Sequence, residues 1–365
     1  MKRVGHLYEK MISDENILRA ILTVNLSHRW RFGHKPNKTV VWVEVTLGER
    51  VKELREIIEN GFVPEKPTIK HRYDKNAKKW RDIAEPRLYP DQYIHHILIQ
   101  VLEPVMMRGM DRYCCGSIKH RGAIYGVRCI KKWMKDDLKG TKHCLEMDIR
   151  HFYDNLQPSE VMKRFRRLIK DRKVLDLIER VMIYGVLIGA FFSQWFANTF
   201  LQPLDEKIRK LGAKHYIRYI DNFTVFSSNK RILKKVVKMT GEWLNGHGME
   251  LKGNWQRFKT KDRMPDALGY RYGHEFTLIR KHRIITMSRQ IKSFFKQKEI
   301  VSANFALSLL SRIGGLKHCN GRTVRDRSVP NGLQRKLKDI VRAYQRKTLV
   351  AWEIAKARML KEVMA

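Results

Sequence analysis

The spacing of apolar positions predicts long helical stretches at both ends of the chain. Val51, Leu54, Ile57 and Ile58 recur three to four residues apart within residues 49–59, which is the period of one helix face. The same period covers much of residues 1–60 and residues 89–104, where Pro104 is expected to end the helix. Further along the chain it covers residues 157–183, a stretch from the 189–194 loop to residue 211, residues 230–244 and residues 287–365. In the last of these, Leu307, Leu310, Ile313 and Leu316 are apolar.

Shorter runs in the middle of the chain predict strands. Residues 71–83 carry mixed charges around a tip at residues 74–77, which is typical of a hairpin. Residues 142–148 alternate, so that Leu145 and Met147 face one side and Asp148 the other. Residues 215–228 read HYIRYIDNFTVFSS, two apolar runs around a central Asx pair, and Asx residues tolerate the positive φ of a tight turn. Helices and antiparallel hairpins together predict an α+β fold.

Two carboxylates stand at strand ends in this pattern. Asp148 closes one predicted strand, and Asp221 occupies the turn of the 215–228 hairpin. Taken alone, Asp221 is equally well explained as a solvated turn residue. Two carboxylates brought together are what two-metal phosphoryl transfer requires, because Mg²⁺ prefers hard oxygen ligands.

Three motifs in order resemble the palm of bacterial reverse transcriptases. The first is Asp148 and Ile149 followed by Phe152-Tyr153-Asp154, and the last is Tyr219-Ile220-Asp221-Asn222. Between them, residues 188–194 read IGAFFSQ, similar to the IGxxxSQ form of diversity-generating retroelement enzymes, whereas most relatives have QGxxxSP. The resemblance extends over roughly residues 1–285.

The resemblance implies a right-hand polymerase of fingers, palm and thumb, the palm built on an antiparallel sheet. It divides the chain into an N-terminal extension with fingers at 1–141, a palm at 142–285 with a helical connection at about 157–187, and a helical thumb at 286–365. Lys163, Arg164, Arg166 and Arg167 are expected on the outer face of that connection.

The family also implies roles for individual residues. The implied metal ligands are Asp148, the carbonyl of Ile149, Asp221 and Asn222, and the implied proton donor to departing pyrophosphate is Lys252. The nucleotide is contacted by Lys79, Arg81, Tyr153, Ile188, Gly189 and Gln194, and the template or primer by Lys119, Arg121, Leu268, Gly269 and Tyr270. The metal is Mg²⁺ as two ions, with Mn²⁺ as the alternative.

Several of these residues also have plain structural interpretations. Lys79 and Arg81 belong to a charged hairpin that could simply be solvated, and Lys119 and Arg121 to a basic loop on a basic protein. Tyr153 is either the ring under the sugar that excludes a 2′-hydroxyl or a core tyrosine. Asp154 is interpreted as structural.

Two positions depart from the usual family pattern. Asn222 stands where a second aspartate is common, which keeps an oxygen ligand and removes one negative charge, so the second metal should be held more weakly. Ile188 stands where most relatives have a glutamine against the nascent base pair, which favours low fidelity; core filling is the alternative.

Composition and charge favour a polyanionic partner. The 365 residues include 75 Lys and Arg against 37 Asp and Glu, a formal charge of +38 and a pI near 10.2. The sequence has no apolar run of membrane-spanning length and no secretory leader pattern, and its five cysteines form no metal-binding spacing, so a soluble, cytoplasmic protein with reduced cysteines is expected.

These observations predict a reverse transcriptase that makes cDNA from a dedicated structured RNA, of the low-fidelity retroelement type. The expected partners are that RNA, the RNA/DNA duplex, dNTPs and an accessory protein or second polymerase subunit, without a membrane. An antiphage-defence reverse transcriptase with a noncoding RNA template, and a catalytically degraded RNA-binding scaffold, are the alternatives; Asn222 supports the scaffold.

Overall fold

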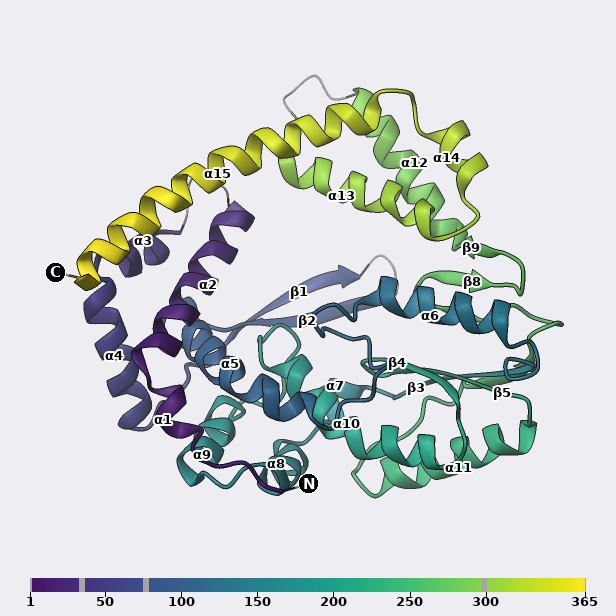
Figure 1. The fold of residues 1–365 in the computed structure, drawn as a ribbon, viewed down its shortest axis with the longest axis horizontal. Coiled ribbons are helices and arrows are strands. Elements are labelled where there is room, and N and C mark those ends of the chain that lie inside the picture. Colours follow the sequence, from purple (N-terminus) through teal and green to yellow (C-terminus); the bar gives the residue numbers. More distant parts are fainter. Residues whose placement is uncertain (1, 33–36, 75–78, 297–300, 365) are drawn as a thin grey trace.

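The computed structural model describes residues 2–32, 37–74, 79–296 and 301–364. Helices and antiparallel sheets alternate along the chain (Figure 1). The elements are α1 Tyr8–Met11, α2 Asp14–Phe32, α3 Lys38–Val45, α4 Leu47–Glu59, β1 Thr68–Asp74, β2 Lys79–Glu85, the π-helix η1 Leu88–Gln92, α5 Tyr93–Met107, α6 Ala123–Asp136, β3 His143–Asp148, α7 Phe152–Asn155, α8 Pro158–Leu168, α9 Arg172–Val181, α10 Ser193–Lys210, β4 His215–Tyr219, β5 Asn222–Ser227, α11 Lys230–Asn245, β6 Gln256–Lys259, β7 Asp266–Ala267, β8 Tyr270–Tyr272, β9 Thr277–Ile279, α12 Lys281–Lys296, α13 Ala303–Gly315, the 3₁₀ helix η2 Leu316–His318, α14 Arg322–Ser328 and α15 Leu333–Met364.

The central sheet has the strand order β4-β5-β3-β6, and every neighbouring pair is antiparallel. Asp148 lies opposite Asn222 in the β3–β5 register, and Tyr219 lies opposite Asn222 in the β4–β5 hairpin. The sheet therefore brings the end of β3 against the hairpin turn. Both predicted strands are confirmed, and so is the α+β fold class.

The two faces of this sheet are covered by different helices. Leu145 and Val225 pack with Leu233 of α11 in the main core, while Cys144 and Phe226 pack with Trp133 of α6 in a second cluster. Alternate residues of β3 and β5 thus point to opposite layers, as the pleat requires. Figure 1 shows α6 above the sheet and α11 below it.

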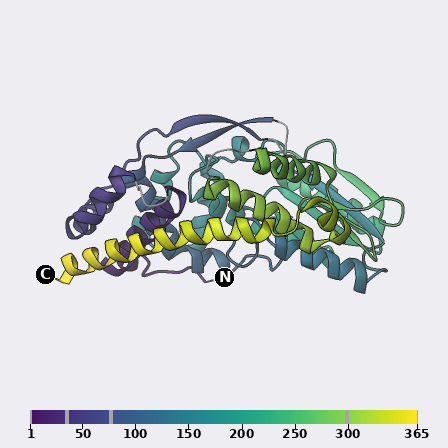
Figure 2. The same ribbon diagram turned by 90° about the horizontal axis from the view of Figure 1, so that it is seen from above.

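The β1–β2 hairpin extends from the sheet as a separate two-stranded ribbon. Its register pairs Arg72 with Arg81 and Asp74 with Lys79, which confirms the predicted hairpin. The tip predicted at residues 74–77 falls, beyond Asp74, outside the described residues. Figure 2 shows the ribbon along one long edge of the molecule.

The C-terminal helices form a small bundle and then return to the N-terminal helices. Ala306, Leu309 and Ile313 of α13 share a core with Leu337 of α15. Further along α15, Trp352 and Met359 are buried in the main core, and the Tyr344 hydroxyl donates to the carbonyl of Trp30 in α2 at 3.1 Å. Helix α15 therefore joins the predicted thumb to the N-terminal extension, as Figures 1 and 2 show.

Three local predictions were wrong. Helix α5 does not end at Pro104 but continues to Met107 with Pro104 inside it. Arg164 is not on an outer face: it is half-buried, and its Nη2 donates to Gln202 at 2.8 Å. Finally, the positive φ of the β4–β5 turn belongs to Ile220, at +58°, not to an Asx residue.

Candidate active site

Asp148 and Asp221 meet at the end of the central sheet. Asp148 is the last residue of β3, and the backbone N–H of Ile149 donates to the carbonyl of Asp221 at 3.2 Å. The Asp148 carboxyl is half-buried. The residues that the sequence predicted as a pair are therefore neighbours in space.

The two carboxylates repel each other. Burial, and next the negative charge of Asp221, raise the pKa of Asp148 to about 6. The charges of Lys252 and Lys79 oppose this rise. Like charges gathered without full compensation are typical of a site that receives cations.

Lys252 and Lys79 approach this carboxylate from two elements. The ammonium of Lys252 lies 3.8 Å from Oδ2 of Asp148, and its backbone N–H donates to the Asp148 carbonyl at 2.9 Å. Lys79 begins β2 and is exposed. Arg81 lies two residues along the same strand, and its Nε donates to Oδ2 of Asp74 at 2.9 Å. Lys79 is thus available to a phosphate, whereas Arg81 already has a carboxylate partner.

Asn222 contacts Asp221 directly. Its Nδ2 donates to Oδ1 of Asp221 at 2.9 Å, and the side chain is exposed at the start of β5. An aspartate at this position could not make that hydrogen bond. The Asn222 amide therefore holds one oxygen of the Asp221 carboxylate.

Tyr153 lies in the short helix α7, directly after β3. Burial, and next the charge of Asp221, raise the pKa of Tyr153 above its ordinary value, so the phenol stays neutral. Its ring packs edge-on against Phe152 with centroids 5.3 Å apart. Tyr153 is therefore half-buried beside the carboxylate pair rather than in the centre of the core.

The IGxxxSQ segment is fixed to the β1–β2 ribbon. The Ile188 carbonyl accepts from the backbone N–H of Ala84 at 2.7 Å. Gly189 has φ +113°, and a Cβ there would lie 2.2 Å from the Ala84 carbonyl oxygen, so only glycine fits. Gln194 lies at the start of α10 and is hydrogen-bonded to Ser117.

The loop before α6 passes directly over the β4–β5 turn that carries Asp221. A Cβ on Gly116 would lie 2.9 Å from the backbone nitrogen of Ile220, so this glycine allows close approach of the two chains. Lys119 follows on the exposed part of the loop. Arg121 is half-buried, and its Nη1 donates to the Asp111 carbonyl at 3.2 Å. The loop offers Lys119 to solvent and uses Arg121 partly for its own structure.

The β7–β8 turn carries the residues predicted to hold the primer. Leu268 and Gly269 have φ values of +54° and +87°, and the Arg283 guanidinium lies over Gly269. Tyr270 is 1% exposed, and its hydroxyl donates to the Gly315 carbonyl at 2.9 Å. The structure corrects the prediction for this side chain: Tyr270 links the turn to the thumb and is too buried to contact nucleic acid.

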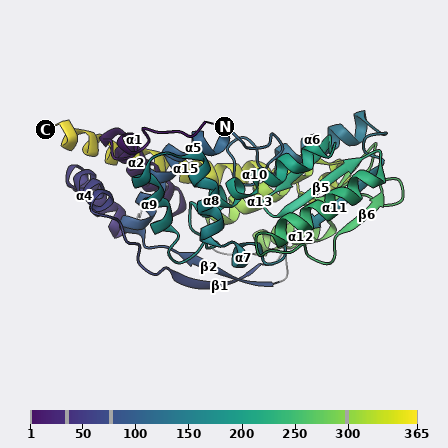
Figure 3. The same ribbon diagram turned by 90° about the horizontal axis from the view of Figure 1, so that it is seen from below.

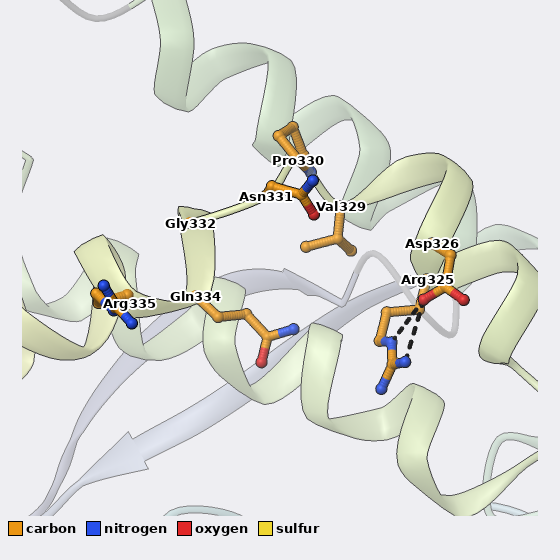
Figure 4. A pocket seen from close by; sticks show the side chains of 8 residues that line it. All are labelled: Arg325, Asp326, Val329, Pro330, Asn331, Gly332, Gln334 and Arg335. Atoms are coloured by element: carbon orange, nitrogen blue, oxygen red, sulfur yellow. Dashed lines mark hydrogen bonds and ion pairs between the residues drawn. The ribbon is translucent and has the colours of Figure 1, made fainter.

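A hollow of about 320 Å³ lies between the β4–β5 hairpin and this turn. Its lining includes Asn222 and Arg283, and also Arg280, which is paired with Asp266 of the same lining at 2.6 Å. A larger hollow of about 590 Å³ lies in the thumb between α14 and α15 (Figure 4). There Arg325 is paired with Asp326 at 3.1 Å.

Sequence reasoning missed the buried support beneath the turn. Arg218 of β4 is completely buried; its Nε and Nη2 donate to the two oxygens of Asp205 at 2.7 Å each, and its Nη1 donates to the Ile220 carbonyl at 3.0 Å. Asn198 accepts from Arg218 at 2.8 Å and donates to the Gly116 carbonyl at 2.7 Å. An arginine inside an apolar strand and an aspartate on the apolar face of α10 were the available signal, because such charges are buried only when paired.

Few side chains at this position could act as metal ligands. Within the described part of the chain, no group of three or more His, Cys, Asp or Glu side chains could hold a metal ion. Asp148 and Asp221 supply two hard carboxylates, and further oxygens must come from backbone, amide or substrate. That donor set fits Mg²⁺, which commonly completes its shell with phosphates and water.

The family described as reverse transcriptase (RNA-dependent DNA polymerase) matches residues 69–272, more than half of the chain. The chain belongs to this family. The match contains Asp148 and the Asp221 turn, together with the whole central sheet. The reverse transcriptase domain thus coincides with the elements that assemble the site.

Curated relatives of this reverse transcriptase are distant. The group II intron-encoded protein LtrA of Lactococcus lactis subsp. cremoris is 22% identical over 213 residues, which are 53% of this chain and 35% of that protein. Protein YkfC of Escherichia coli (strain K12) is 22% identical over 265 residues, 67% of this chain and 62% of that protein. The chain spans less than two thirds of the length of either relative.

Similar solved structures include two telomerases. The Candida albicans telomerase in complex with the TWJ fragment of telomeric RNA has 12% identity and a TM-score of 0.46, covering 86% of this chain and 63% of that chain. The apo telomerase of Candida tropicalis has 11% identity and a TM-score of 0.45, covering 95% and 77%. In the described residues no helix is long and apolar enough to span a membrane.

Proposed function

We propose that this reverse transcriptase is an active RNA-directed DNA polymerase that makes cDNA from a dedicated structured RNA. The observation that carries the proposal is the approach of Asp148 and Asp221 at the end of the family-matched sheet, with Lys252 3.8 Å from the Asp148 carboxylate. Paired carboxylates next to an ammonium are suited to nucleotidyl transfer.

The proposed metal ligands are Asp148, Asp221, the carbonyl of Ile149 and the amide oxygen of Asn222. The mutual repulsion of Asp148 and Asp221 supports this assignment, because a divalent cation would remove it. Two Mg²⁺ ions, or Mn²⁺ in their place, would supply charge stabilisation at the transferred phosphoryl group. Lys252 would then be free to donate a proton to the departing pyrophosphate.

The nucleotide would lie between the β1–β2 ribbon and α7. Lys79 suits a triphosphate because it is exposed and its charge reaches Asp148, whereas Arg81 would first have to leave Asp74. Tyr153, beside Asp221, would pack under the sugar, and Gly189 and Gln194 would line the same space. Lys119 and the Leu268-Gly269 turn would follow the template and the primer.

The type of reverse transcriptase that we propose rests on Ile188 and on the motif around it. An isoleucine cannot make the polar contact that most relatives make with a glutamine, so we propose a low-fidelity retroelement enzyme that diversifies a target gene. We divide it into fingers at 1–141, palm at 142–285 and thumb at 286–365. A defence enzyme with a noncoding RNA template and an accessory protein remains the second candidate, since it would use the same site residues.

The test is dNTP incorporation on a primed RNA template by the purified chain, with Asp148→Ala, Asp221→Ala and the matched control Asp154→Ala. Asp154 is exposed in α7 and lies close in sequence to Asp148. We expect incorporation by the wild type and the control and none by the other two. Unchanged incorporation by Asp148→Ala would refute the site, and RNA binding without incorporation by the wild type would leave the scaffold alternative.

A further inference from the structure

A dense group of cations covers the side of the palm sheet that faces away from Asp148. We call it the rear basic patch. Its members are exposed and come from α11 and from the edge strand β6: Lys230, Arg231, Lys234, Lys235, Arg257 and Lys259. Figure 3 shows α11 and β6 next to each other on the underside.

The register of the sheet fixes which face these cations occupy. His143 and Leu145 of β3 point toward α11, whereas Glu146 and Asp148 point toward the opposite face. Lys259 lies opposite His143 in β6, and Arg257 lies opposite Leu145, so both point to the α11 side. The Arg257 Nη1 donates to the Lys230 carbonyl at 3.3 Å, which joins β6 to the start of α11.

The patch is also at the far end of the strand from the catalytic residues. His143 and Asp148 are five positions apart in β3, and a strand advances about 3.3 Å per residue, which separates them by about 17 Å. A duplex held on the Asp148 face cannot contact side chains on the reverse of the same sheet. Any ligand of the patch therefore binds outside the polymerase cleft.

The charges of the patch are not compensated within the protein. In the described ranges no ion pair links any of the six cations to a carboxylate, whereas Lys238, further along α11, lies 3.8 Å from Glu242. Burial, and then the charges of Lys142, Lys259, Lys230 and Arg257, lower the pKa of His143. An anionic partner would relieve this repulsion.

The composition of the surface distinguishes among polyanions. Trp255, which is 40% exposed, lies two residues before Arg257, and none of the other exposed large apolar side chains of the described residues is adjacent in sequence to the patch. Single-stranded nucleic acids are commonly held by several stacked aromatic side chains, and membrane-surface helices insert several apolar residues, so both would need more such side chains than this one tryptophan. Double-stranded RNA is recognised mainly through its phosphates and shape, for which point charges suffice. Lys230 and Lys234 are one helical turn apart, about 6 Å along the axis.

We propose that the rear basic patch binds a double-stranded stem of the RNA that the enzyme copies. The proposal rests on the proposed function, because it assumes that the template belongs to a structured RNA. The stem would anchor the RNA on the back of the palm while its single-stranded part enters the cleft. The patch thereby selects the dedicated RNA over other templates without touching the reacting atoms.

The experiment compares two probes: a primed single-stranded RNA template, and the same template joined to a stem of about 20 base pairs, longer than the roughly 16 that a double-stranded RNA-binding domain spans. The variant is Lys230→Glu, Lys234→Glu and Lys259→Glu. The matched control, with the same change in charge, is Lys52→Glu, Lys66→Glu and Lys170→Glu, three exposed lysines outside the patch. Affinity is measured across salt concentrations, and incorporation is measured on the template without the stem.

We expect the patch variant to bind the stem probe about tenfold or more weakly than the control does, with a salt slope lower by about 2 to 3, since each lost phosphate contact removes about 0.7 to 0.9. Incorporation on the stemless template should match the control.

Equal losses of RNA affinity in both variants, or a loss of affinity confined to anionic lipid vesicles, would overturn the proposal. Unchanged RNA affinity would also overturn it, and the cations would then be explained as residues that keep the edge strand β6 from pairing with another chain. A wild type that binds the stem but incorporates nothing would instead refute the proposed function.

Discussion

The guanidinium of Arg218 donates to the backbone carbonyl of Ile220 at 3.0 Å, one residue before Asp221. Ile220 has φ +58°, a conformation that β-branched residues rarely adopt, and Gly116 packs against its backbone. A strained residue persists only where its surroundings determine it. The buried Arg218–Asp205 pair therefore supports the β4–β5 turn that carries Asp221.

Replacing Arg218 by methionine should destabilise the protein and abolish most incorporation. Asp205 would be left as a buried, unpaired carboxylate, and loss of one partner of such a pair costs about 3–5 kcal/mol. The free energy of unfolding in urea and the kcat for dNTP incorporation are the measurements.

A second substitution separates the structural role of Arg218 from its positioning role. In Arg218→Met with Asp205→Asn, no buried charge remains and the Tyr216 hydroxyl keeps an acceptor, so stability should largely return. Incorporation should stay at least tenfold below wild type, and the Mg²⁺ concentration for half-maximal rate should rise, because the Ile220 carbonyl still lacks its donor. Recovery of activity together with stability would assign the pair to stability alone.

Removing the charge of Asp148 should not destabilise the fold. The pKa of Asp148 is raised to about 6, above its unfolded value, so its ionisation between about pH 4 and 6 weakens the folded state. Asp148→Asn in EDTA should therefore be as stable as wild type at pH 7, or more so, and its advantage should vanish near pH 4. Thermal unfolding at the two pH values measures this, with Asp154→Asn as the control. A large loss of stability at pH 7 would contradict the repulsion.

An aspartate at position 222 should strengthen metal binding. Asn222→Asp adds a third negative charge at the carboxylate pair and removes the amide donor to Asp221. The Mg²⁺ concentration for half-maximal incorporation should fall several-fold, and in Asn222→Ala it should not fall. If the two variants have the same metal requirement as wild type, residue 222 is not a ligand.

The sequence was sufficient for the elements that carry the site. Alternation in residues 142–148 and the two apolar runs around Asp221 predicted β3 and the β4–β5 hairpin, and motif order predicted that their ends would meet. What periodicity could not show is long-range pairing. The contact of Arg218 with Asp205 and the approach of Gly116 to Ile220 depend on how α10 and the 116 loop lie against β4, which no local pattern encodes.

The same reason explains the misplaced details. Local propensity assigned the positive φ to Asp221 or Asn222, but the buried hydrogen bond from Arg218 imposes it on Ile220. Tyr270 carries a family motif, yet its side chain is buried, and its hydroxyl donates to the carbonyl of Gly315 in the thumb. Tertiary packing decided both positions.

Gly189→Ala should displace the β1–β2 ribbon. The new Cβ would lie 2.2 Å from the Ala84 carbonyl, in addition to the strain of φ +113°. Gly185→Ala is the matched control, because Gly185 also has a positive φ, +95°, but its nearest neighbour would be a Leu187 methyl at 3.7 Å. The melting temperature should fall more for Gly189→Ala, and the KM for dNTP should rise only there, since Lys79 and Arg81 lie on the displaced ribbon. Equal changes in melting temperature and KM for the two variants would mean that the strain of the positive φ, and not the clash with Ala84, causes the loss.

Shrinking Tyr153 tests the steric argument separately from the metal site. The ring lies half-buried beside Asp221, where a packed aromatic under the incoming sugar would leave no volume for a 2′-hydroxyl. Such discrimination comes from a clash, so removing the ring should admit ribonucleotides while chemistry continues. Tyr153→Ala should raise the ratio of kcat/KM for rNTP over dNTP by about tenfold or more, equivalent to about 1.4 kcal/mol. Tyr153→Phe keeps the ring and should keep the wild-type ratio. Equal losses for both nucleotides in Tyr153→Ala would identify Tyr153 as a core residue, because a packing defect lowers both rates alike.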